Sequence, residues 1–368
     1  MKNLPIKIRL RQKIRNTEMK KGDVFMVTIL LTDGEFTGMI RALRERPDVR
    51  IIGFLFSQDT AHRTMLDRAY VAPSWDDPEY IPFLYEVIKK ESVDLIFPVV
   101  TKSLPLMALH AEEIYEKTGA VVVTAPYPVI KTANHKAALF SRLKEDPLTA
   151  EYITDFRVTR TIGDLKKDLK IPFVVKPVVG ENKEGFLLGV SDEKWHQAFL
   201  KGQSGRLLCP GLLELMKDED SFLEERLIMP YLPGQEWDAD LLVIEGKIVS
   251  ATIRKNLQMF DGLSACTETS EDQKVLKACE KIVQVLGLKY LNCISFKETE
   301  EGDLKLLEIN PRAMGSIYVS ALGKNNLVTR LLSILLREKD EPGFRLTHSG
   351  LRTALYYDII PLSSGGEE

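Results

Sequence analysis

The segment that decides the fold reads Leu304-Lys305-Leu306-Leu307-Glu308-Ile309-Asn310-Pro311-Arg312-Ala313-Met314-Gly315-Ser316. It begins as an apolar strand and ends in a turn. Side chains alternate along a strand, so Leu306, Glu308 and Asn310 share one face. Mg²⁺ takes carboxylate and amide oxygens together with oxygens of phosphate and water. With Pro311 and Arg312 directly behind, this strand end predicts a site for phosphate-bound Mg²⁺ rather than a solvated Asn-Pro turn.

Length and composition set the limits for the rest of the chain. At 368 residues the chain is too long for one ordinary core and predicts two or three domains. Fifty basic against 53 acidic residues give a net charge of −3, so no nucleic-acid partner is indicated. The longest apolar run, residues 24–31, is too short to span a membrane. Four cysteines without a C-x-x-C pair favour a reducing compartment, and we expect a cytoplasmic protein.

Residues 1–22 differ from the remainder, because they contain eight basic residues and one acid. Three interpretations stay open: a solvated basic arm, an organellar transit peptide, or a start codon placed before a true start at Met19. The segment lacks serine, which is unusual for a transit peptide. We therefore leave this arm out of the fold prediction.

Residues 23–128 alternate between apolar strand patterns and amphipathic helix patterns. Predicted strands cover residues 24–31, 49–56, 94–100 and 120–124, and predicted helices cover 36–46, 78–90 and 102–117. Such alternation is typical of a doubly wound parallel α/β domain. The segment has no G-x-G-x-x-G, so it does not predict a dinucleotide site of the usual kind.

Two lysines occur in unusual settings after this domain. Lys176 lies inside the apolar strand 172–177, where a buried charge is costly unless an anion pairs with it. Lys136 falls in the first turn of a helix that Asn134 can cap, although many lysines in such places are simply solvated. A loop containing Gly180 and Gly185 follows the strand and could be an exposed hairpin or a phosphate-covering flap.

Three motifs in this order carry a resemblance to a known family. They are Val174-Val175-Lys176-Pro177, Pro233-Gly234-Gln235-Glu236 and Glu308-Ile309-Asn310-Pro311-Arg312. Together they resemble the ATP-grasp ligases, in particular the group similar to the carbamoyl phosphate synthetase large subunit. The resemblance covers residues 23–340 and implies an N-terminal α/β domain followed by a two-lobed α+β ATP-grasp domain. We expect that domain at 129–340, with lobe one at 129–230, lobe two at 231–340, and a C-terminal strand and tail at 341–368.

The resemblance also implies roles for individual residues. It assigns Mg²⁺ to Glu308 and Asn310, and the transferring phosphoryl group to Arg254 at a strand end and to Arg312. The remaining implied nucleotide contacts are Lys136 and Lys176 on the phosphates, Gly180 and Gly185 in the flap, Tyr231 and Leu232 at the adenine, and Glu236 at the ribose. The segment 262–269 is expected to be a loop over the site.

The sequence departs from the family pattern at several positions. His135 replaces an aspartate, Pro230 replaces a glutamate, and Glu181 and Glu184 enter the flap. Ser295 stands where the family supplies Gln, Glu or Asp as a second metal ligand. Glu236, Asp238 and Asp240 alternate along one predicted strand, and we interpret Asp238 as part of the solvated face of an edge strand. Ser295 is the most serious departure, because a hydroxyl is a poor substitute for a carboxylate as a Mg²⁺ ligand.

The function implied by the resemblance is ATP-dependent ligation. ATP would phosphorylate a substrate carboxylate, and an amine or another nucleophile would attack the acyl phosphate while ADP leaves. ATP and Mg²⁺ are the expected cofactors, and small carboxylic acids and amines are the expected substrates. A homodimer is compatible with this function. Two alternatives stay open: an ATP-binding module that has lost catalysis, and a subunit of a larger synthetase.

Overall fold

The computed structural model describes residues 26–167, 169–180, 185–260, 263–338, 340, 342–356, 359–360 and 362. The basic arm at 1–22 and the flap residues Glu181 and Glu184 lie outside these ranges. Within the described part, no helix is both long and apolar enough to cross a membrane. Each of the four cysteines carries a free thiol.

The N-terminal domain is the predicted doubly wound parallel sheet. Its strands run in the order β3-β2-β1-β4-β5 and all pair in parallel. They are β1 (Val27–Leu31), β2 (Val49–Leu55), β3 (Arg68–Val71), β4 (Leu95–Phe97) and β5 (Val121–Val122). Helix α2 (Thr37–Arg44) packs on one face, while α3 (Tyr80–Glu91) and α4 (Leu104–Thr118) pack on the other. Strand order reverses between β1 and β4, so their carboxyl ends border a crevice where ligands bind in such sheets.

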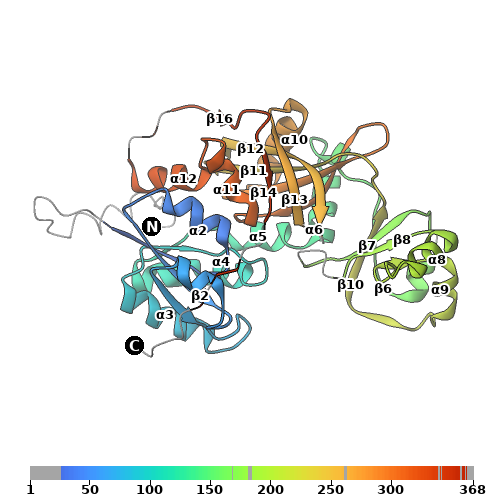
Figure 1. Cartoon of the computed structure of the whole chain (residues 1–368), viewed down its shortest axis with the longest axis horizontal. Helices are drawn as coiled ribbons and strands as arrows, with labels where there is room; N and C mark the ends of the chain where they lie inside the picture. Colours follow the sequence, from blue (N-terminus) through green and yellow to red (C-terminus); the bar gives the residue numbers. More distant parts are fainter. Residues whose placement is uncertain are drawn as a thin grey trace, which may run out of the picture.

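Lobe one follows after α5 (Tyr127–Ala133) and α6 (Lys136–Lys144). Its sheet has the order β6-β10-β7-β8-β9. The strands are β6 (Arg157–Thr161), β7 (Phe173–Pro177), β8 (Leu187–Gly189), β9 (Leu207–Leu208) and β10 (Ser221–Pro230), with helices α7 (Ile162–Lys166), α8 (Asp192–Leu200) and α9 (Pro210–Leu215). This lobe stands apart at the right of Figure 1, while the N-terminal domain lies at the lower left.

Lobe two is a large sheet in the order β15-β14-β11-β12-β13-β17, with β16 pairing with β12. The strands are β11 (Glu236–Ile244), β12 (Lys247–Phe260), β13 (Leu263–Ser270), β14 (Tyr290–Glu298), β15 (Leu304–Asn310), β16 (Arg345–Leu346) and β17 (Arg352–Ala354). Helix α10 (Gln273–Leu286) covers one face, and α11 (Tyr318–Leu322) and α12 (Leu327–Leu336) lie between this sheet and the N-terminal domain (Figure 1).

Two sequence predictions about β12 and β13 are wrong. The segment expected as a loop at 262–269 forms strand β13 from Leu263 onward, and β12 continues to Phe260. The two segments pair as a long hairpin, which satisfies their backbone hydrogen bonds. Arg254 therefore lies in the middle of a strand and is fully buried, not at a strand end on the surface.

The two faces of the lobe-two sheet have opposite chemistry. Trp237, Ala239 and Leu241 on β11 pack against the apolar face of α10. Asp238 and Asp240 point to the other face, yet both are buried. The prediction of a solvated Asp238 on an edge strand is wrong, because β11 is an inner strand that pairs with both β12 and β14.

The turn after β15 docks on the N-terminal domain. Helix α2 passes so close to the short 3₁₀ turn η3 (Gly315–Ile317) that a Cβ at Gly38 would lie 2.0 Å from the carbonyl oxygen of Gly315. Only glycine permits this approach. The end of β15 is thereby fixed against the N-terminal domain.

Candidate active site

Two lysines of lobe one reach the end of β15 in lobe two. Lys136 is the first residue of α6, and its Nζ donates to the carbonyl of Gly180 at 2.8 Å and lies 3.4 Å from Glu308 Oε2. Lys176, in β7, donates from Nζ to the carbonyl of Leu307 at 2.8 Å. The contacts to Leu307 and Glu308 join residues more than 130 positions apart in the sequence. The predicted phosphate lysines and the predicted metal carboxylate therefore lie together between the lobes.

The start of α6 differs from the expectation in one respect. His135 is the N-cap, and its Nδ1 accepts a hydrogen bond from the amide of Ala138 at 3.2 Å. Asn134, the expected cap, instead donates to the carbonyl of Thr101 at 3.0 Å. A neutral histidine nitrogen can accept a hydrogen bond as an aspartate oxygen does. The change at position 135 thus preserves the helix start that holds Lys136 in its first turn.

The charges at this site influence one another strongly. Burial, and then the nearby charge of Lys136, lower the pKa of Lys176 to about 7. The Nζ of Lys176 also lies 5.5 Å from the centre of the Phe140 ring. Burial alone would raise the pKa of Glu308, but Lys136, Lys176 and a hydrogen bond from Asn310 outweigh it, so this pKa is lowered. Glu308 is therefore ionised at neutral pH.

The donor set at the end of β15 suits Mg²⁺ that arrives with a nucleotide. Asn310 Nδ2 donates to Glu308 Oε1 at 3.2 Å, so its amide oxygen is the atom that could face a cation. Among the residues described here, no three His, Cys, Asp or Glu side chains are grouped so as to hold a metal alone. Two oxygen ligands fit Mg²⁺ whose remaining ligands are phosphate oxygens and water.

Ser295 lies on β14, between two strands that each carry a carboxylate beside it. It pairs with Glu308 on β15 at one side and with Asp238 on β11 at the other. Its Oγ donates to Asp238 Oδ1 at 2.6 Å. The carboxylate expected at position 295 is absent, but another carboxylate contacts the same place from the next strand.

Arg254 forms a buried ion pair inside the polar face of the lobe-two sheet. Its Nη2 lies 2.9 Å from Asp240 Oδ2 and 3.8 Å from Asp238 Oδ2. Burial raises the pKa of Asp240, although Arg254 opposes the rise. The pKa of Arg254 is raised because the two aspartates outweigh its own burial. No nitrogen of Arg254 and no oxygen of Asp240 makes a hydrogen bond of normal geometry.

The hinge between the lobes contains the residues predicted for adenine and ribose. The amide of Tyr231 donates to the carbonyl of Pro172 at 3.2 Å, so an adenine contact here would need the Tyr231 carbonyl or the backbone of Leu232. A Cβ at Gly234 would lie 2.6 Å from Cβ of Glu298, so the hinge requires glycine. Glu236 Oε2 lies 3.1 Å from Lys297 Nζ, which neutralises and orients that carboxylate.

The two flap glycines border the part of the loop that is not described. The carbonyl of Gly180 accepts from Lys136, as given above. Gly185 has φ of +63°, and its carbonyl accepts from Arg226 Nη1 at 3.1 Å. The two ends of this loop are thus tied to Lys136 and to Arg226 of β10.

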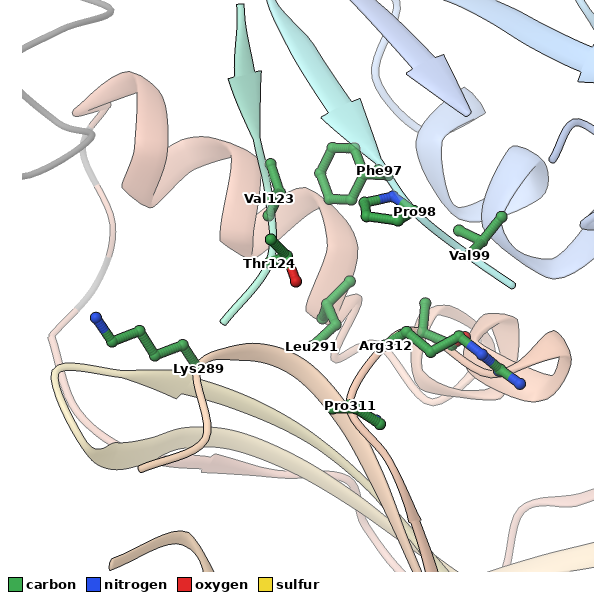
Figure 2. A pocket seen from close by; sticks show the side chains of 10 residues that line it. Phe97, Pro98, Val99, Val123, Thr124, Lys289, Leu291, Pro311 and Arg312 are labelled. Carbon is green, nitrogen blue, oxygen red and sulfur yellow. The ribbon is translucent and has the colours of Figure 1, made fainter. Parts of the chain in front are cut away.

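Arg312 turns toward the N-terminal domain. Its Nε and Nη2 donate to Thr101 Oγ1 at 3.3 and 3.0 Å, and its Cζ lies 5.6 Å from the centre of the Phe36 ring. Figure 2 shows its side chain running past Val99 at the end of β4, on the side away from Lys289. A cavity of about 10 Å³, room for about one water, lies beside it. Arg312 therefore links the end of β15 to the crevice of the parallel sheet.

Sequence reasoning did not identify several residues of this site. Thr101 anchors both Asn134 and Arg312, but it follows an ordinary strand end and no pattern marks it. Phe140, under Lys176, is part of a helical apolar stripe. For Asp238 a signal existed, since it alternates with Glu236 and Asp240 on one strand face.

Comparison with known families gives two matches to separate parts of the chain. Residues 39–123 match the family described as PylC-like, N-terminal domain. Residues 222–354 match the family described as ATP-grasp in the biosynthetic pathway with Ter operon. Carnosine synthase 1 of Gallus gallus is 30% identical over 102 residues. That match covers 25% of this chain and 11% of the relative, so it spans about a tenth of that protein's length.

Solved structures share the fold over most of the chain at low identity. N5-carboxyaminoimidazole synthetase from Staphylococcus aureus, complexed with ADP, has a TM-score of 0.63 at 17% identity and covers 89% of this chain and 82% of its own. L-amino acid ligase from Bacillus licheniformis has a TM-score of 0.60 at 17% identity, with coverages of 87% and 75%. The biotin carboxylase domain dimer of Hydrogenobacter thermophilus 2-oxoglutarate carboxylase, in complex with MgADP, has a TM-score of 0.61 at 13% identity, with coverages of 87% and 72%.

These matches agree with the motifs that the structure brings together between the lobes. The fold prediction, a parallel α/β domain followed by a two-lobed ATP-grasp domain, is confirmed. The chain therefore contains a PylC-like domain at its N-terminal side and an ATP-grasp domain behind it.

Proposed function

We propose that this protein is an ATP-dependent ligase that joins a small carboxylic acid to an amine through an acyl phosphate, releasing ADP and phosphate. The observation that carries the proposal is the meeting of Lys136 and Lys176 with Glu308 across the two lobes. Two cations beside a carboxylate and an amide form a suitable receptor for a nucleotide triphosphate with its metal. The ADP and MgADP in the structures named above support the same cofactors.

In the proposed reaction a carboxylate oxygen of the acid attacks the γ-phosphorus of ATP. The bond between that phosphorus and the β–γ bridging oxygen breaks, and ADP leaves. The amine nitrogen then attacks the acyl carbon, phosphate leaves, and the nitrogen loses a proton. The chemistry needs mainly positioning and charge neutralisation, so no protein nucleophile is required.

Each predicted residue has a place in this proposal. Lys136 and Lys176 bind the phosphates, and Glu308 and Asn310 hold Mg²⁺, which would supply charge neutralisation at the phosphate oxygens. Gly180 and Gly185 bound the flap. Tyr231 and Leu232 receive the adenine, and Glu236 the ribose. Arg312, at the crevice of the parallel sheet, binds the acid. Arg254, buried within the polar face of the lobe-two sheet, stabilises the charge of the transferring phosphoryl group.

Formation of ADP tests the proposal directly. Purified protein with ATP and Mg²⁺ should release ADP when given both a pool of small carboxylic acids and a pool of amines, and an amide should form in equal amount. Omission of either pool should remove the amide. Protein that binds ATP but releases no ADP with any acid–amine pair would contradict the proposal. That result would favour an ATP-binding module, the alternative that Ser295 raises.

Two further expectations accompany the proposal. Four free thiols suit a reducing compartment such as the cytoplasm. The homodimer stays a prediction, which light scattering on purified protein would check. A stable complex with a second, different chain would favour a subunit of a larger synthetase.

A further inference from the structure

A row of three paired residues crosses the polar face of the lobe-two sheet. Glu308 on β15 pairs with Ser295 on β14, and Ser295 pairs with Asp238 on β11. Neighbouring strands lie about 4.7–4.9 Å apart. Ser295, in the middle of this row and directly beside Glu308, bears only a hydroxyl. Asp238, on the far side of Ser295 from Glu308, bears a carboxylate.

The Asp238 carboxylate is held between β14 on one side and β12 and β13 on the other. Its Oδ1 lies 2.6 Å from Ser295 Oγ, while Oδ2 accepts from Asn256 Nδ2 at 3.0 Å and from Ser264 Oγ at 3.3 Å. An ionised carboxylate has about four lone-pair sites, and these three hydrogen bonds leave one of them. All three donors are neutral groups, so they orient Asp238 without cancelling its charge.

The charge balance of the surrounding face also points to a cation. Asp238 and Asp240 share a single arginine, Arg254, whereas Glu236 pairs with Lys297, and Glu308 has both Lys136 and Lys176 nearby. Asp240 is fully buried, and neither of its oxygens makes a hydrogen bond of normal geometry. Excess negative charge in a buried site is costly unless it is paired. A divalent ion beside Asp238 would supply the missing positive charge.

We propose that Asp238 is the second carboxylate of the metal–nucleotide site, in the role that the family pattern gives to residue 295. In this arrangement Ser295 acts as a positioning residue, because its hydroxyl holds Oδ1 of Asp238 on the side of β14. The inference rests on the proposed function, since the ion arrives with the nucleotide. It explains how a chain with serine at position 295 keeps two carboxylates for the metal, one from β15 and one from β11.

Manganese binding in the presence of a non-hydrolysable ATP analogue tests this assignment independently of turnover. Free Mn²⁺ is measured by electron paramagnetic resonance, and analogue binding without metal is measured by calorimetry. Asp238→Ser should weaken Mn²⁺ binding by roughly 10–100-fold or remove one bound ion, which is the range for losing a ligand or its support. Analogue affinity without metal should not fall. Glu280→Gln removes an exposed carboxylate on α10, behind the same sheet, and should change neither quantity.

The decisive variant exchanges the two side chains. Asp238→Ser combined with Ser295→Asp returns a carboxylate to β14 and should restore most of the Mn²⁺ affinity. Unchanged Mn²⁺ affinity and stoichiometry in Asp238→Ser would overturn the proposal. So would a well-folded exchange variant that stays as weak as Asp238→Ser, since Asp238 would then be only a structural anchor. Asp238→Asn serves as the near-isosteric variant if Asp238→Ser does not fold. Wild-type protein that binds no analogue at all would instead overturn the proposed function.

Discussion

Two charged regions of the candidate active site contain similar groups but differ in how they are held. At the end of β15, Lys136 and Lys176 come from one lobe and Glu308 from the other, and their side chains meet between the lobes. Beneath the polar face, Asp240 and Arg254 belong to adjacent strands of one sheet and are fully buried. The first region can exchange its internal contacts for a ligand, whereas the second is part of the structure. Mutations should therefore affect ligand binding in one region and stability in the other.

The largest effect is expected at Glu308. Glu308→Gln keeps the shape of the side chain but removes the charge that would face the metal. Turnover should fall by roughly 10²–10³-fold or more, as when one electrostatic group of a transition state is lost. The melting temperature should stay close to that of the wild type. Glu300→Gln, an exposed change in the turn before β15, provides the control and should keep full activity. Full activity of Glu308→Gln would mean that the strand end has been misinterpreted.

Arg254 should show the opposite behaviour, with its main effect on stability. Arg254→Met leaves Asp240 buried without its partner, and removal of one member of a buried pair costs about 3–5 kcal/mol. Urea unfolding followed by circular dichroism would measure the loss. Replacing both partners, as in Arg254→Met with Asp240→Leu, should recover much of it, because no buried charge stays unpaired. Arg352→Met, which breaks an exposed pair with Glu268, should have little effect. Equal stability of Arg254→Met and wild type would break the comparison between the two regions.

How far the sequence predicted each region follows from the type of contact involved. The end of β15 could be predicted because its chemistry lies within one short stretch and the lysines occur in unusual strand and helix settings. The polar face could not, because it depends on which strands neighbour one another. An alternation of Glu236, Asp238 and Asp240 looks the same on an edge strand and on an inner strand. Only the pairing of β11 with both β12 and β14 shows that Asp238 is buried.

The sequence failed to predict the settings of Arg254, Arg312 and His135 for the same reason. Arg254 was predicted at a strand end because the polar run Arg254-Lys255-Asn256 follows an apolar strand pattern, whereas pairing with β13 extends the strand. Arg312 follows the metal turn directly, and the sequence alone could not show that its guanidinium contacts Thr101 of the other domain. His135 as a cap was missed because residue preferences at helix starts rank histidine low. Local patterns thus predicted the elements, while contacts between elements required the structure.

Lys176 should contribute mainly to ligand binding. Lys176→Ala should weaken ATP binding by about 1.5–3 kcal/mol, which is the range for a hydrogen bond to a charged group. Its hydrogen bond in the free protein is to one backbone carbonyl at 2.8 Å, so the unfolding free energy should change much less than in Arg254→Met. Calorimetric titration with ATP and urea unfolding measure the two quantities on the same sample. Unchanged ATP affinity would remove Lys176 from the nucleotide site.

Arg312 should affect turnover more than ATP affinity. If it binds the acid at the crevice of the parallel sheet, its contact to the transferring phosphoryl group forms mainly in the transition state. Arg312→Ala should then reduce kcat/KM for the acid by a larger factor than it reduces ATP affinity. Thr101→Val, which removes the hydroxyl that holds the guanidinium, should give a smaller loss of the same kind. Equal losses of turnover and ATP affinity in Arg312→Ala would make it a nucleotide-binding residue.

The smallest expected effect is a proton taken up when ATP binds. Burial and the charge of Lys136 lower the pKa of Lys176 to about 7, so at pH 8 most of the folded protein carries a neutral amine there. Phosphate oxygens favour the charged form and should raise this pKa in the complex. The γ-phosphate itself is already deprotonated at pH 8, since its second pKa lies near 6. Binding at pH 8 should therefore take up a fraction of one proton, and ATP affinity should decrease as the pH rises above 7.

Calorimetry in two buffers of different ionisation enthalpy measures that uptake. Lys176→Arg keeps a positive charge that stays protonated at every accessible pH, so the uptake should disappear while binding persists. The same pKa has a consequence for stability with a fixed sign. In the unfolded chain Lys176 has its ordinary pKa, which is higher than the value of about 7 in the folded protein. Between these two pKa values the unfolded state therefore binds more protons than the folded state. The folded state becomes more stable as the pH rises through that window. Lys176→Arg should remove this part of the pH dependence. Identical proton uptake in wild type and Lys176→Arg would show that another group titrates, and would move the ionisable centre of the site away from Lys176.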